Sequence, residues 1–144
     1  MSLETYGVTV EIPREAWRLF CERLSLYRGV SMDVGIHFAS SERYLAREVP
    51  LHSLIFDDFG DPDLVFVEYG PPNRRPLQHR VVSPERFVLR KETGDDGYGR
   101  LEIPAQYGVT VMNFRPAIHP ALVEGLVARR LAGLEHSGLL ALVN

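Results

Sequence analysis

The stretch YGVTVEIPREAWRLFCERLSLYRG (residues 6–29) changes its hydrophobic period at Pro13, and this change indicates the fold class. Before Pro13, apolar and polar residues alternate, which is the spacing of a strand with one buried face. After Pro13, the apolar residues recur at helical spacing until Gly29, a residue that commonly ends helices. Because proline suits the first position of a helix, the stretch predicts a strand followed by a helix at 13–28.

The period of two returns in residues 30–115, in short runs separated by turns rich in Gly, Pro and Ser. The runs of strand character are 32–38, 44–56, 64–69, 77–83, 86–92, 100–105 and 107–115. The second run is expected to bend at Pro50, since proline is tolerated in a sheet only at an edge or a bulge. Successive strands without intervening helices indicate an antiparallel meander.

A second helix is predicted at the C-terminal end, with Pro120 at its first position. Its expected apolar stripe consists of Val123, Leu126, Val127, Leu131 and Leu134. Gly125 and Gly133 each weaken such a helix by roughly 1 kcal/mol relative to alanine, so packing would have to hold it. The predicted fold is therefore α+β: an N-terminal helix, a strongly bent antiparallel sheet of about six strands approaching a small open barrel, and a C-terminal helix.

The length of the chain, 144 residues, fits a single domain (1–144), with a core at about 8–135 and an apolar tail at 136–144. A lone cysteine, Cys21, excludes an internal disulfide and favours the cytoplasm as the compartment. We expect no membrane span, because no uninterrupted apolar run has the required length, and no secretory signal, because the N-terminus lacks a basic segment followed by an apolar one. A net charge of −3 gives no overall attraction to nucleic acid.

The pentapeptide YGVTV occurs twice, at 6–10 and at 107–111. A duplicated fold should also repeat the residues between the copies, and no such match exists. Since these residue types favour strands anyway, we interpret the repeat as coincidence. The alternative is that the two copies are strands in related positions of the sheet.

Few residues form a pattern that is typical of catalysis or of metal binding. The run DDFGDPDLVFVE (57–68) has carboxylates at several EF-hand positions, but Pro62 stands where that loop needs glycine, so we predict an acidic turn. The histidines lack metal-ligand spacing, and no phosphate loop or dinucleotide motif is present, so we expect no metal and no cofactor. Cys21 lies on the apolar helix stripe and is expected to be a buried hydrophobe.

The charge distribution is the least ordinary feature of the chain. Segment 74–91 contains Arg74, Arg75, Arg80, Arg86, Arg90 and Lys91 with one acid, whereas segment 42–68 is strongly acidic. One interpretation is pairing of opposite charges across neighbouring strands. The other is a basic hairpin that binds phosphate or an acidic partner.

Three short motifs stand out along the chain: EIPREAW (11–17), RLEI (100–103) and FRPAIHPALVEGLV (114–127). Together they resemble a family of small bacterial proteins of unknown function. The resemblance implies one compact domain with a helix, a sheet and a second helix, and it implies no reaction and no catalytic residue.

Three functions follow as hypotheses. The first is a non-enzymatic interaction domain that binds a protein or a small ligand through a sheet face and forms a homodimer by burying its C-terminal tail, in particular Leu139, Leu140, Leu142 and Val143. The second is nucleic-acid binding through the basic hairpin at 74–91. The third is a small hydrolase or isomerase with His37 or His79 as general base near an acid such as Glu68. The candidate binding residues are His37, Arg74, Arg75, His79 and Arg80.

Overall fold

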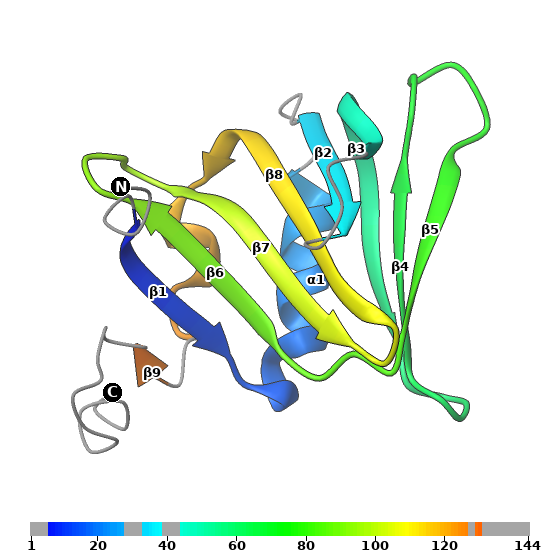
Figure 1. Cartoon of the computed structure of the whole chain (residues 1–144), viewed down its shortest axis with the longest axis horizontal. Coiled ribbons are helices and arrows are strands. Elements are labelled where there is room, and N and C mark those ends of the chain that lie inside the picture. Colours follow the sequence, from blue (N-terminus) through cyan, green and yellow to red (C-terminus); the bar gives the residue numbers. More distant parts are fainter. Residues whose placement is uncertain (1–5, 28–32, 39–43, 127–128, 131–144) are drawn as a thin grey trace.

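A computed structural model of the chain describes residues 6–27, 33–38, 44–126 and 129–130 (Figure 1). Its strands are β1 (Tyr6–Ile12), β2 (Asp33–Phe38), β3 (Tyr44–Asp57), β4 (Leu64–Tyr69), β5 (Leu77–Val82), β6 (Phe87–Glu92), β7 (Tyr98–Ala105), β8 (Gly108–Ile118) and β9 (Arg129–Arg130). The predicted α+β class with an antiparallel sheet is confirmed. The expected number of about six strands is wrong, because nine strands are present in the described residues.

The strands follow the order β5-β4-β3-β2-β8-β7-β6-β1-β9, so the sheet is not the single meander that the sequence indicates. It consists of two meanders, β2 to β5 and β6 to β8, which join where β2 pairs with β8. The strand before the helix, β1, is added beside β6. Within the described residues the sheet does not close into a barrel, since β5 and β9 remain its two edges.

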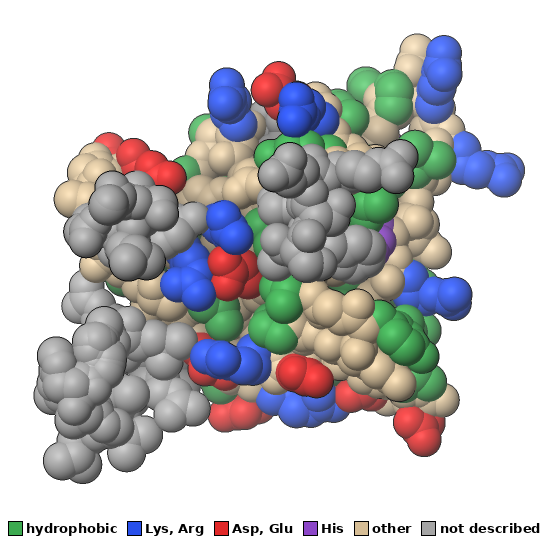
Figure 2. Space-filling model, viewed as in Figure 1, with side chains coloured by type: hydrophobic (Ala, Val, Ile, Leu, Met, Phe, Trp, Pro, Cys, Tyr) green, Lys and Arg blue, Asp and Glu red, His purple; other side chains and the backbone are tan. Residues whose placement is uncertain are grey.

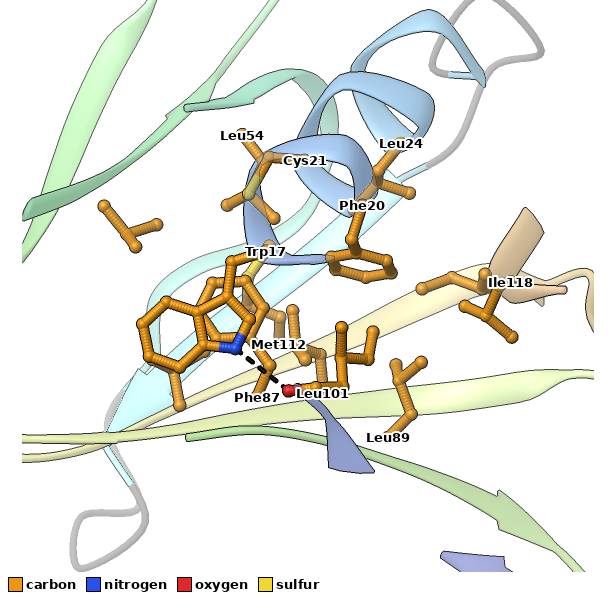
Figure 3. Close-up of a cluster of buried hydrophobic side chains, with 14 of the residues drawn as sticks. Trp17, Phe20, Cys21, Leu24, Leu54, Phe87, Leu89, Leu101, Met112 and Ile118 are labelled. Atoms are coloured by element: carbon orange, nitrogen blue, oxygen red, sulfur yellow. Dashed lines mark hydrogen bonds between the residues drawn. The ribbon is translucent and has the colours of Figure 1, made fainter. Parts of the chain in front are cut away.

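The predicted segment 13–28 contains a 3-10 turn at Arg14–Ala16 and then the α-helix α1 (Trp17–Tyr27). The helix is shorter than expected, and it is not the N-terminal element because β1 precedes it. Its buried residues come from one stripe, Trp17, Phe20, Cys21 and Leu24, which packs on the sheet (Figure 3). None of the described helical segments is long and apolar enough to cross a membrane.

The predicted C-terminal helix is not found in the described residues. Pro120–Val123 forms a 3-10 turn, after which Glu124 is extended (φ −61°, ψ 130°) and Gly125 has a positive φ of 82°. An α-helix cannot continue through either conformation, so the apolar spacing misled the prediction. The chain instead adds Arg129–Arg130 to the sheet as β9, beside β1. Leu131 and Leu134, which the prediction placed on the helix, lie outside the described residues.

Strand β3 changes its pairing partner along its length. Its first half pairs with β2 up to Pro50, and its second half pairs with β4 from Leu51 onward. A register shift and a positive φ of 51° at Glu48 accompany the change of partner, close to the bend predicted at Pro50. The strand is continuous from Tyr44 to Asp57, as expected.

Helix α1 covers one edge of the second half of β3, where β2 no longer pairs with that strand. The hydroxyl Oγ of Ser25 donates to the carbonyl of Leu54 (3.0 Å) and accepts from the N–H of Leu54 (2.9 Å). Two residues further along β3, the carbonyl of Phe56 accepts from Arg18 Nη1 (3.2 Å). These side chains replace a neighbouring strand as the partners of the β3 backbone.

The core lies between α1 and the inner face of the sheet. Trp17 stacks on Phe87 with ring centroids 4.6 Å apart, and Phe56 meets its edge at 5.3 Å. The indole Nε1 donates to the carbonyl of Ile12 (3.0 Å), the last residue of β1 (Figure 3). A single tryptophan therefore ties the start of the helix to β1, β3 and β6.

The two YGVTV copies have different roles. The first copy places Val10 in the hydrophobic core. In the second copy the matching residue, Val111, is buried but lies outside that core cluster, while its neighbour Thr110 pairs with the core residue Ile103. Because side chains alternate between the faces of a sheet, the copies lie in opposite phase, which supports the interpretation as coincidence.

Candidate functional site

The hairpin of β4 and β5 presents the most exposed part of the described chain. Every residue from 71 to 78 is exposed, including Arg74 and Arg75 in the connecting loop and Leu77 at the start of β5. In Figure 2, Lys and Arg side chains extend from the right margin of the molecule, where Figure 1 shows β5 and this loop. The hairpin therefore combines a strand edge with positive charge.

The outer edge of β5 carries backbone groups that β4 does not use. The N–H of Ser83 donates to the carbonyl of Asp63 (2.9 Å), and the N–H of Gln106 donates to the carbonyl of Val82 (3.1 Å). Because antiparallel ladders alternate residue by residue, the N–H and C=O groups of Gln78 and Arg80 point to the same side as the carbonyl of Val82, away from β4. Among the backbone contacts of the described residues, the one with Gln106 covers only the far end of that edge.

The five arginines of segment 74–91 fall into two groups. Arg86 pairs with Glu11 on β1 (3.2 Å) and Arg90 pairs with Glu102 on β7 (3.0 Å), which matches the interpretation of charge pairing across strands. In the described part of the chain, no ion pair is formed by Arg74, Arg75 or Arg80. The second group lies together on the β4–β5 hairpin and is the available basic surface.

His79 and Glu68 do not meet in the structure. The imidazole Nε2 of His79 lies 3.1 Å from Thr110 Oγ1 of β8, on the inner side of the curled sheet. The carboxylate of Glu68 accepts from Ser53 Oγ (2.7 Å) and from Gln78 Nε2 (3.2 Å) on the outer side. His79 pairs with Val67, and Glu68 is the strand neighbour of Val67. Because neighbouring residues of a strand point to opposite faces, Glu68 and His79 lie on different faces and are not arranged for acid–base catalysis.

Burial lowers the pKa of His79 below its ordinary value of 6.5, because the charged imidazolium loses hydration. The unfolded chain therefore takes up this proton at a higher pH than the folded protein does. The stability that the neutral imidazole contributes is complete above pH 6.5 and is lost as the pH falls from there through the folded pKa.

We therefore expect the free energy of unfolding to decrease as the pH falls below 6.5, and His79→Gln to make this decrease shallower. Urea unfolding between neutral and mildly acidic pH measures the slope. Gln106→Ala, a change of an exposed residue that does not titrate, is the control and should keep the slope of the unchanged protein. An equal slope in His79→Gln would contradict this assignment.

The other histidines contribute backbone contacts or lie in segments without described side chains. His52 Nε2 is 2.8 Å from the carbonyl of Gly70, and His119 Nδ1 accepts from the N–H of Ala121 (3.0 Å). His37 lies in β2, where its backbone pairs with Val111 of β8, and its side chain is outside the described set.

The acidic run 57–68 includes the turn between β3 and β4, which arginines of α1 and of the preceding 3-10 turn hold, and ends within β4. Asp58 pairs with Arg18 and Asp63 pairs with Arg14. Asp57 Oδ1 accepts from the N–H of Phe59 (3.0 Å) in the turn itself. No group of three metal-binding side chains forms among the described residues.

Cys21 has the character of a buried hydrophobe. Its side chain is in the core, and burial raises the pKa of the thiol far above the ordinary value, outweighing the nearby Arg18 guanidinium. The thiol therefore stays protonated, which is unsuited to nucleophilic chemistry.

A cavity of about 670 Å³ lies at the opposite end of the sheet, between the tip of the β6–β7 hairpin and the end of β8. Its lining includes Gly99, Arg100, Asn113 and Arg115, none of which the sequence patterns single out. The available signal was the alternation of Gly97 and Gly99 at the start of a strand, because missing side chains in a strand often mark close approach or open space.

No known protein family, no curated protein and no solved structure matches the chain. The resemblance to a family of small bacterial proteins stays a prediction.

Proposed function

We propose that this protein is a non-enzymatic binding domain that recognises an extended acidic segment of another protein by strand addition at the edge of β5. The supporting observation is the outward backbone of Gln78 and Arg80 on an open edge whose arginines have no ion-pair partner among the described residues. An added strand would satisfy these N–H and C=O groups, as in other domains that bind peptides along a sheet edge.

The side chains of β5 give this edge a pattern. Leu77 pairs with the core residue Tyr69, so it belongs to the inner face, yet 63% of it is exposed. Arg80 belongs to the outer face, where Gln78 also lies. The residues of an added strand alternate in the same way, so the preferred segment alternates apolar and acidic side chains.

A second copy of the same edge is a poor partner. Antiparallel pairing of β5 with β5 would bring the arginines of the two hairpins together, and like charges directly opposite each other are destabilising. The homodimer expected from Leu139, Leu140, Leu142 and Val143 is a separate proposal, because those residues lie outside the described ranges. Light scattering of the full chain at micromolar concentration tests it, and a monomer would contradict it.

The two other hypotheses receive less support. The separation of His79 from Glu68 weighs against the hydrolase or isomerase hypothesis. Nucleic acid would use the same arginines, Arg74, Arg75 and Arg80, but it would not need the backbone of an open strand edge. The dependence on that backbone therefore separates a peptide from a nucleic acid.

A fluorescent peptide of alternating glutamate and leucine, measured by anisotropy, tests the proposal against a peptide of equal composition without the alternation. We expect the alternating peptide to bind more tightly. Gln78→Pro should weaken binding about tenfold, because it removes the outward N–H and obstructs the edge. The matched control Gln78→Ala keeps that N–H and should bind normally. Since the N–H of Gln78 does not serve the β4 ladder, the proline variant is expected to fold.

Equal binding of the two peptides, or equal binding by Gln78→Pro and Gln78→Ala, would overturn strand addition. A single-stranded oligonucleotide serves as the second ligand. If it binds with a steep salt dependence that Arg80→Gln reduces and Gln78→Pro leaves unchanged, while the peptide does not bind, the nucleic-acid hypothesis replaces this one.

A further inference from the structure

The outer face of β3, β4 and β5, which lie side by side at the right of Figure 1, carries apolar side chains that the core does not use. In one row across the strands, Ile55 pairs with Phe66, and Phe66 pairs with Arg80. Ile55 is 42% exposed and Phe66 is half-buried. The next pair on this face, Leu64 and Val82, is also apolar and half-buried. The open face of an antiparallel sheet is commonly polar, so this apolar face indicates a surface that another molecule covers.

Opposite charges lie at the two sides of this row. On one side, α1 runs beside β3, and a groove of about 490 Å³ between them is lined by Glu22 and Ile55. On the other side, Arg80 ends the row on the edge strand β5. Glu22 and Arg80 are both exposed, and neither forms an ion pair among the described residues.

The charged side chains close to Glu22 and Arg80 have other partners. Arg18, one helical turn before Glu22, pairs with Asp58. Glu68, which lies on the same face of β4 as Phe66, accepts hydrogen bonds from side chains of β3 and β5. Across the four neighbouring elements α1, β3, β4 and β5, the row therefore has the order acid, apolar, apolar, base.

This order is complementary to itself. Consider two copies whose outer faces pack together about a two-fold axis that is parallel to the strands and lies between β3 and β4. The α1 side of one copy then lies over the β5 side of the other. Ile55 faces Phe66 of the second copy, and Glu22 faces Arg80 of the second copy, each contact occurring twice by symmetry. Two packed sheets with nearly aligned strands are a common arrangement.

We propose that the protein forms a homodimer through this outer face, with Ile55 and Phe66 at its centre and Glu22 paired with Arg80 on both sides. The groove between α1 and β3 offers room for the Arg80 side chain of the second copy. Each ion pair would be flanked by apolar side chains that exclude water, which strengthens it.

This contact differs from the two self-associations considered above. It does not involve the C-terminal tail, and it does not pair β5 with β5, so the arginines of the two hairpins are not brought together. The backbone edge of β5 stays open in the dimer. Arg80 also belongs to the proposed peptide site, so an acidic peptide and the second copy would compete for its side chain.

Sedimentation velocity of the full chain over a series of concentrations measures the dissociation constant of the dimer. Glu22→Arg and Arg80→Glu should each weaken the dimer about tenfold or more, because each places like charges opposite one another. The double variant Glu22→Arg/Arg80→Glu should dimerise like the unchanged protein, since the pairs form again with reversed sign. Glu92→Arg changes an exposed acid of the β6–β7 hairpin, is the matched control and should dimerise normally.

Three outcomes would overturn the proposal. The first is a monomer at all concentrations up to about 1 mM. The second is a dimer that neither single variant weakens, which would place the contact elsewhere, for example in the tail. The third is a double variant that dimerises no better than the single variants. Glu22 and Arg80 are exposed, so all variants are expected to fold. The peptide experiment compares Gln78→Pro with Gln78→Ala, which both keep Glu22 and Arg80, so its result does not depend on this one.

Discussion

Trp17→Ala is expected to lower the free energy of unfolding by about 3–5 kcal/mol, the largest effect of any single change considered for this protein. The substitution removes an indole that is 2% exposed and leaves a cavity between Phe56 and Phe87. It also leaves the carbonyl of Ile12 without its donor. Because Trp17 is the only tryptophan, unfolding in urea should be followed by circular dichroism rather than fluorescence.

The control for this change lies on the same helix. Leu26 is 84% exposed, and Leu26→Ala should change the free energy of unfolding by no more than about 0.5 kcal/mol. Trp17→Phe keeps an aromatic ring but loses the hydrogen bond, so its loss should lie between the two. A loss for Trp17→Ala no larger than that for Leu26→Ala would contradict the described core.

Gly97→Ala is expected to have the second largest effect, a loss of about 2–3 kcal/mol in the free energy of unfolding. A Cβ atom there would lie 2.6 Å from the carbonyl oxygen of Ile118 and 3.1 Å from the Cβ of Ala117. The oxygen belongs to the backbone and cannot rotate away, so β7 and the end of β8 would have to separate.

Gly99, two residues along the same strand, is the matched control for Gly97. Its added Cβ meets nothing within 4 Å, and its φ is not in the left-handed region. Gly99→Ala should therefore be neutral, or should stabilise by about 0.5 kcal/mol through the lower entropy of the unfolded chain. Thermal and urea unfolding of the two variants, measured together, provide the comparison. Equal stabilities would show that β8 does not approach Gly97 in solution.

The strands were predictable because their alternation of apolar and polar residues follows from burial on one face. The run LVFVEY was predicted at 64–69, and β4 has these bounds. The C-terminal helix was not predictable, since Val123 and Leu126 are buried by a 3-10 turn and a left-handed Gly125 just as well as by a helix. Helical spacing over so few residues does not separate these outcomes.

Which residues are available at the candidate sites depends on how the strands pair with one another. Local sequence patterns do not show this pairing. Composition placed Arg74, Arg75 and Arg80 in one basic segment with Arg86 and Arg90. Only the pairing of β1 with β6 and of β6 with β7 shows that the last two are held by carboxylates far away in the sequence. The cavity lined by Gly99 likewise arises because Gly99 alone on β7 faces residues 114–117 of β8, which no local pattern reports.

The contact between α1 and the second half of β3 has a consequence for the solubility of the protein. Ser25 and Arg18 form hydrogen bonds with backbone groups of Leu54 and Phe56. Without them, the run LHSLIFD of β3 would have an unpaired strand edge. If the helix detached, this run could recruit the same run of another molecule and start intermolecular β-structure. Conditions that detach the helix without unfolding the sheet should therefore produce aggregates. With the helix in place, the edge of β3 is covered and unavailable for pairing with another molecule.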